Sequence, residues 1–91
     1  MVALNEVLQQ GKDQIATDVD GEVVMMSVQQ GEYYGLDSVG SRIWELFEQP
    51  KTTEQVIDVL TAEYEVDRKT CEQDVIQFVD ELMGKGLLIK A

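Results

Sequence analysis

The side chains that could do chemistry in this sequence are one cysteine and eighteen carboxylates, with no histidine beside them. Cys71 as a nucleophile would need a base to form its thiolate, and without histidine the sequence supplies none. The same absence leaves no ligand set for zinc, and one cysteine excludes an internal disulfide. The sequence therefore favours a structural or idle thiol at Cys71.

Paired carboxylates could in principle carry acid–base chemistry or hold a hard cation. The pairs are Asp18 with Asp20 and Asp80 with Glu81. On a chain with eighteen acidic residues, adjacent acids are more often a solvated face. Glu63, Glu65 and Asp67 lack the spacing of a calcium loop. We therefore expect no metal ion, no cofactor and no catalytic residue, and we predict that the protein is not an enzyme.

The net charge limits the partners that the chain can have. Seven basic and eighteen acidic residues give a formal charge of -11 at pH 7, which repels phosphate backbones and keeps a protein soluble. No apolar run approaches the roughly 20 residues that span a bilayer, and the N-terminus lacks the pattern of a secretion signal. We therefore expect a cytoplasmic protein that binds neither nucleic acid nor membrane.

Two tyrosines lie between glycines in the stretch GEYYGLDSVG at 31–40, which could belong to the core or form an open sheet edge. Alternation along a strand puts Tyr34 in phase with Leu36, toward the helices, and leaves Tyr33 on the opposite face with Gly35. Glycine weakens a strand interior unless another backbone must come close, so this strand is compatible with the addition of an extended peptide. The alternative, in which both tyrosines are ordinary strand residues, stays open, and for Tyr34 a core position is favoured.

The surrounding segments predict one α+β domain over residues 1–91, with a strand meander at its start. Residues 1–12 could be a short strand or a loose arm, and the sequence leaves this choice open. The predicted meander strands are 14–19, 22–28 and 32–36, with a hairpin turn at Asp20 and Gly21. The middle strand is nearly all apolar, so we expect it to be covered on both faces. The last strand should be an edge of the sheet.

Three helices should follow the meander, each opened by a polar cap. Asp37, Thr52 and Asp67 stand at the N-cap positions, and Gln55 completes a capping box with Thr52. The first helix should stop shortly after Glu48, ahead of Pro50, and its expected apolar positions are Ile43, Trp44, Leu46 and Phe47. The second helix should end near Glu65, and its expected apolar positions are Val56, Ile57, Leu60 and Tyr64. The third should run to about Met83, before a short strand at 87–89. This order is typical of a winged helix-turn-helix-like domain.

The third helix carries an apolar arc of roughly 160°, wider than the ~100° that faces one core. Cys71, Asp74, Val75 and Phe78 share one side of this helix. If that side borders the edge strand, a peptide added to the strand would lay alternate side chains against it. Taken alone, the arc is better explained by packing between the sheet and the neighbouring helices. A DNA-binding role for the helix is disfavoured, because acidic residues such as Glu72 and Asp80 would repel phosphates.

Residues 22–89 resemble the PqqD-like family of RiPP recognition elements, which bind the leader peptides of ribosomally made, modified peptides. The resemblance rests on GxYYxL in the edge strand, a polar cap before IWxL, TxxxVIxxL in the second helix and DVxxFVxxLxxxGLL at the end. Within the family, the sequence is most similar to the stand-alone leader-binding proteins of lasso-peptide pathways. Asp37 stands where many members have asparagine, which is an equivalent cap.

The resemblance implies a winged-helix domain whose third meander strand accepts the leader as an added antiparallel strand, wedged against the third helix. The implied leader-binding residues are Glu32, Tyr33, Tyr34 and Gly35 on the strand and Cys71, Asp74, Val75 and Phe78 on the helix. We expect apolar or aromatic leader residues to enter between Tyr33 or Tyr34 and Phe78. The protein would be a non-catalytic adaptor that presents a precursor to a separate processing enzyme, in lasso pathways a leader peptidase.

Two alternatives to this adaptor stay open. The chain could be a PqqD-type chaperone that delivers a precursor to a radical SAM enzyme. It could also be a structural module that pairs with itself or with another protein and has no peptide ligand. Its expected oligomeric state is a monomer or a weak dimer formed by strand exchange.

Overall fold

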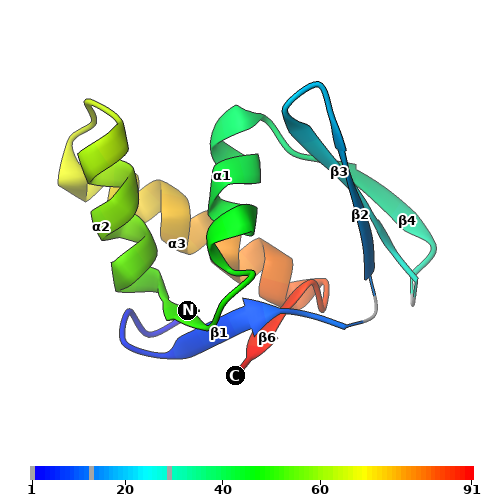
Figure 1. The fold of residues 1–91 in the computed structure, drawn as a ribbon. Helices are drawn as coiled ribbons and strands as arrows, with labels where there is room; N and C mark the ends of the chain where they lie inside the picture. Colours follow the sequence, from blue (N-terminus) through cyan, green and yellow to red (C-terminus); the bar gives the residue numbers. More distant parts are fainter. Residues whose placement is uncertain (1, 13, 29) are drawn as a thin grey trace.

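The computed structural model describes residues 2–12, 14–28 and 30–91, which form two antiparallel sheets and three helices (Figure 1). Their order is β1 (Val7–Gln10), β2 (Gln14–Val19), β3 (Glu22–Ser27), β4 (Glu32–Gly35), α1 (Ser38–Leu46), β5 (Lys51–Thr52), α2 (Thr53–Glu63), α3 (Arg68–Gly84) and β6 (Leu88–Lys90). The predicted α+β order of meander, three helices and closing strand is confirmed. The single-domain organisation over 1–91 stays a prediction, and Met1 of the predicted 1–12 segment lies outside the described residues.

The meander forms the sheet β2-β3-β4, in which β3 is central. Asp20 and Gly21 both have positive φ, 53° and 85°, which confirms the two-residue hairpin between β2 and β3. Asp18 supports this turn by accepting a hydrogen bond from the Gly21 amide at 2.8 Å. Within the described residues β4 pairs only with β3, so the prediction that this strand is an edge is confirmed.

The prediction that the middle strand is covered on both faces is wrong. Val23 and Met25 are buried, whereas Val24 on the other face is 38% exposed. The covered face packs on α1, where the Ser41 hydroxyl accepts a hydrogen bond from the Val23 amide at 2.8 Å. The helices lie to one side of this sheet, so its other face stays open to solvent (Figure 1).

The N-terminal segment is a strand and not a loose arm. β1 is the middle strand of the second sheet, β5-β1-β6, and its Leu8 is fully buried. The backbone amide of Val2 donates to the Asp80 carboxylate of α3 at 2.9 Å, which holds the segment before β1 in place. β5 was not predicted, because its two residues acquire strand geometry only by pairing with β1.

All three predicted helix caps are confirmed. Asp37 and Asp67 accept hydrogen bonds from the amides three residues on, and Thr52 and Gln55 form the capping box. The expected place of Tyr64 on the apolar face of the second helix is wrong. α2 ends at Glu63, and Tyr64 has an extended backbone with φ of -122° and a side chain that is 38% exposed.

The core lies between the three helices and the covered faces of the two sheets. Its fully buried side chains include Leu8, Met25, Phe47, Val56, Ile57, Val75, Val79, Leu87 and Leu88. Within the part of the chain that the structure describes, no helix has the length and apolar character needed to cross a membrane.

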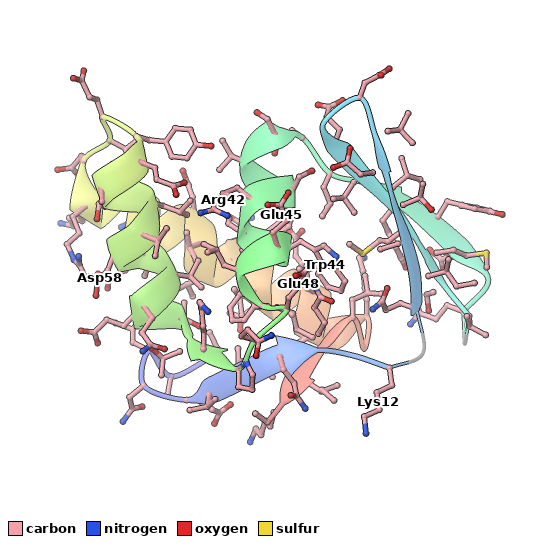
Figure 2. The ribbon with its side chains drawn as sticks, viewed as in Figure 1. Lys12, Arg42, Trp44, Glu45, Glu48 and Asp58 are labelled. Atoms are coloured by element: carbon pink, nitrogen blue, oxygen red, sulfur yellow. The ribbon has the colours of Figure 1, made fainter. Side chains whose placement is uncertain are left out.

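One ion pair on the surface ties α1 to the end of α2. Figure 2 shows Arg42 pointing from α1 toward α2, and its Nη2 lies 2.7 Å from Glu63 Oε2. The hydrogen bond from Arg42 lowers the pKa of Glu63 below its ordinary value. Exposed pairs contribute little to stability, and this one lies at the end of α2, next to Tyr64.

Candidate functional site

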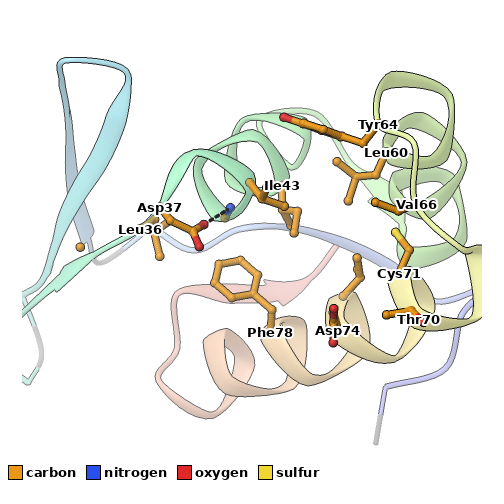
Figure 3. Close-up of a pocket in the computed structure, with 14 residues that line it drawn as sticks. Leu36, Asp37, Ile43, Leu60, Tyr64, Val66, Thr70, Cys71, Asp74 and Phe78 are labelled. Atoms are coloured by element: carbon orange, nitrogen blue, oxygen red, sulfur yellow. Dashed lines mark hydrogen bonds between the residues drawn. The ribbon is translucent and has the colours of Figure 1, made fainter.

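A pocket of about 530 Å³ lies where β4 ends, between α1 and the N-terminal half of α3 (Figure 3). Its lining residues are Gly35, Leu36, Asp37, Val39, Gly40, Ile43, Leu60, Tyr64, Val66, Thr70, Cys71, Asp74, Val75 and Phe78. Volumes of this size are typical of ligand sites, which span about 300–1,000 Å³. Most of the lining side chains are apolar, so the pocket suits apolar or aromatic groups of a ligand.

The absence of a side chain at Gly40 determines how closely α1 and α3 approach each other across the pocket. A Cβ at Gly40 would lie 3.3 Å from Cζ of Phe78 and 3.1 Å from Oδ1 of Asp37. The Phe78 ring can therefore pack against the backbone of α1 near the cap, where Asp37 accepts from the Gly40 amide at 2.7 Å (Figure 3). The glycine that closes the stretch 31–40 thus shapes the pocket beside the edge strand.

The free edge of β4 leads into this pocket. The Leu36 amide donates to the Val23 carbonyl at 2.8 Å, which fixes the phase of the hydrogen bonds between β4 and β3. Because neighbouring residues of an antiparallel strand bond to opposite sides, Tyr34 faces β3 like Leu36. The backbone N–H and C=O groups of Tyr33 and Gly35 point to the free edge. An extended peptide beside β4 would pair with these two residues.

The two tyrosines occupy opposite faces of the sheet, as predicted from alternation. Tyr33 pairs with Met26 and is 74% exposed, whereas Tyr34 pairs with Met25 and packs against the edge of the core. The Tyr34 hydroxyl donates to Gln30 Oε1 at 2.9 Å, and desolvation raises its pKa. Tyr34 is therefore half-buried, which corrects its expected place in the core.

A cation–π contact connects β4 to the far end of α3. Lys85 Nζ lies 4.9 Å from the centre of the Tyr34 ring. Lys85 is the C-cap residue of α3, where a positive charge also suits the helix dipole. This contact is one link between the edge strand and the C-terminal end of the third helix.

The structure brings five of the eight predicted site residues together in the pocket. These are Gly35, Cys71, Asp74, Val75 and Phe78. The other three, Glu32, Tyr33 and Tyr34, lie along β4 outside the pocket. Leader binding by all eight stays a prediction. We refer to the β4 edge together with the pocket as the groove.

Sequence reasoning missed the lining residues that come from α1, α2 and the turn before α3. Tyr64 and Val66 are two of them, 38% and 47% exposed. Large apolar side chains in the acidic segment from Glu63 to Asp67 were a usable sign of a surface with a partner. The Gly40 contact could not be found in this way, because it depends on where α3 packs.

Cys71 is 8% exposed and forms part of the pocket wall. Burial raises the pKa of its thiol, the Asp74 charge raises it further, and Arg68 opposes the shift. A thiol with a raised pKa is a poor nucleophile at neutral pH. Among the described residues, no group of three or more His, Cys, Asp or Glu side chains could hold a metal ion.

The family model described as coenzyme PQQ synthesis protein D (PqqD) matches residues 22–88 of this chain. The chain belongs to the PqqD family. The family match begins at β3 and includes β4 and the three helices, and therefore every residue of the pocket. It leaves β1 and β2 outside.

Three solved structures resemble this PqqD-family chain. TbiB1 in complex with the TbiA(beta) leader peptide is 44% identical, with a TM-score of 0.82 over 88% of this chain and 93% of that chain. A lasso peptide synthetase B1 complexed with its leader peptide is 24% identical, with a TM-score of 0.79 over 90% of this chain and 96% of that chain.

The third structure is the PqqD truncation of Methylobacterium extorquens PqqCD, a functional and stand-alone RiPP recognition element. It is 16% identical, with a TM-score of 0.79 over 99% of this chain and 96% of that chain. At such low identity, this structure and the lasso peptide synthetase B1 establish the shared fold alone. No curated protein matches the chain.

Proposed function

We propose that this chain binds the leader peptide of a ribosomally made precursor as an added strand on β4, with leader side chains seated in the groove. The observation that carries this proposal is the free backbone edge at Tyr33 and Gly35, which runs directly into an apolar pocket walled by α3. The complex of the 44% identical TbiB1 with a leader peptide supports the same assignment.

The two halves of the groove would contribute differently to recognition. Backbone hydrogen bonds to Tyr33 and Gly35 would be formed with almost any extended sequence, so they supply affinity without selectivity. The pocket between Phe78 and Ile43 would accept one or two apolar or aromatic side chains at fixed positions of the leader. Spacing of these side chains along the leader would then decide which precursor is bound.

We further propose that the chain is an adaptor and not an enzyme. The raised pKa of Cys71 and the lack of histidine leave no activated nucleophile in the groove. A separate enzyme, most simply a leader peptidase, would then act on the precursor that this chain presents. The resemblance of the sequence motifs to the stand-alone leader-binding proteins of lasso-peptide pathways favours this partner over a radical SAM enzyme. Location in the cytoplasm stays a prediction.

Titration of a fluorescently labelled leader peptide tests this proposal. The peptide is the TbiA(beta) leader that the 44% identical TbiB1 binds, and binding is followed by fluorescence anisotropy. Phe78→Ala removes an aromatic wall of the pocket, so we expect the dissociation constant to rise about 5- to 150-fold, equivalent to about 1–3 kcal/mol. Gln73→Ala is the matched control, because Gln73 is exposed on the same helix and does not line the pocket.

Val75→Glu provides a second variant, with a charge placed in the pocket wall. Val75 is 2% exposed, so circular dichroism must show that the variant still folds. Unchanged affinity in both Phe78→Ala and a folded Val75→Glu would contradict the groove assignment. Sedimentation with and without leader separates the adaptor from a structural module, since the adaptor binds leader in a defined ratio whereas the module only associates with itself.

A further inference from the structure

The outer face of the sheet β2-β3-β4 presents a continuous apolar surface to solvent. Ile15, Met26 and Tyr33 are directly paired across the three strands and therefore lie side by side on one face. Val24 belongs to the same face, two residues before Met26. The exposed fractions are 57% for Ile15, 38% for Val24 and 74% for Tyr33. We call these four residues the outer face.

Neither the core nor the pocket uses the side chains of this surface. The core is built on the opposite side of β3, from Val23 and Met25, and no outer-face residue lines the pocket. Soluble monomers rarely expose contiguous apolar patches unless the patch contacts a partner or a membrane. No described segment of the chain covers this face, so it is available to a partner.

The outer face is continuous with the proposed leader site, and this inference rests on that proposed function. A leader strand paired with Tyr33 and Gly35 would become the fourth strand of the sheet. Its side chains that point away from the groove would then stand next to Tyr33 on the outer face. A protein seated on this face would contact the sheet and the bound leader at the same time.

The negative charge of the chain around the outer face determines which kind of molecule can bind to this face. The chain carries a formal charge of -11, and exposed Asp20 and Glu22 border the outer face at the β2–β3 hairpin. A second copy would bring the same charge against itself, and an anionic membrane would be repelled as well. The complementary partner is a protein whose apolar patch is bordered by lysine or arginine.

We propose that the outer face docks the processing enzyme that acts on the bound precursor, through an apolar patch with a basic border. The enzyme must reach the leader, and this is the surface on which leader and adaptor lie side by side. Binding of the leader enlarges the surface by one strand. The enzyme therefore binds the leader-loaded chain more tightly than the free chain.

The test uses a purified leader peptidase as the processing enzyme and measures its binding to the immobilised chain by biolayer interferometry, with and without saturating leader. Ile15→Lys places a positive charge against the basic border, and Val24→Thr removes apolar area while keeping strand propensity. We expect each variant to weaken enzyme binding at least about tenfold and to leave the leader dissociation constant within about twofold. Val7→Lys is the matched control, since Val7 is 43% exposed on the other sheet.

Enzyme binding equal to wild type in both outer-face variants would overturn the proposal. A wild-type dimer in sedimentation that Ile15→Lys dissociates would overturn it in favour of a second copy. Failure of the proposed function looks different, because the wild type would then bind no leader in the anisotropy titration. In that case the docking proposal is tested by the binding of the enzyme to the chain without leader, and Ile15→Lys must still weaken that binding.

Discussion

Replacing Gly35 with proline removes one donor from the free edge of β4 and leaves the pairing between β4 and β3 in place. The Gly35 N–H points away from β3, because the next amide, that of Leu36, is the one that donates to Val23. Proline is tolerated on an edge strand when its nitrogen faces solvent. Gly35→Ala is the matched control: it keeps the N–H, and a Cβ at this position meets no atom within 4 Å.

The expected effect follows from the cost of an unpaired carbonyl. A leader carbonyl that would accept from Gly35 is covered in the complex and has no other donor, which costs about 1–3 kcal/mol. The dissociation constant of Gly35→Pro should therefore rise about 5- to 150-fold over that of wild type. Gly35→Ala should bind leader within about twofold of wild type, since the hydrogen bond is retained.

Anisotropy titrations of the labelled leader measure both variants, and circular dichroism melting confirms that each is folded. The comparison between alanine and proline isolates the N–H group, because both variants lose the glycine. If Gly35→Pro and Gly35→Ala bind the leader equally well, the backbone of β4 does not pair with it. Strand addition would then be wrong even if the pocket itself still held the peptide.

Two further predictions concern the pocket wall and the fold that supports it. Iodoacetamide should label Cys71 slowly at neutral pH, because burial and Asp74 raise its pKa and only the thiolate reacts. Its labelling rate should keep rising with pH beyond the ordinary cysteine pKa of about 8.5. Bound leader should protect the thiol from the reagent. Labelling at the same rate with and without leader would show that the peptide binds elsewhere. Gly11→Ala should lower stability by about 1–3 kcal/mol, because a Cβ there would lie 2.5 Å from the Gly86 carbonyl oxygen. Thermal melting checks this, with Gly84→Ala as the control in open space, and an equal Tm for the two variants would contradict it.

The amino-acid sequence determined the features that depend on neighbours along the chain. Asp20 and Gly21 specify the hairpin because both adopt positive φ. Asp37 and Thr52 mark helix starts because their side chains accept from amides three residues on. Alternation along β4 placed Tyr33 and Tyr34 on opposite faces, and these local rules need no knowledge of the rest of the fold.

Tertiary structure alone decided which faces are covered and which side chains meet. Alternation in β3 distinguishes the face of Val23 from that of Val24, but only the packing of α1 covers the first and leaves the second open. The pocket likewise needs Phe78 to reach Gly40 across 38 positions of sequence. Residues so far apart in the chain have no shared local pattern, so their contact exists only once α3 packs against α1.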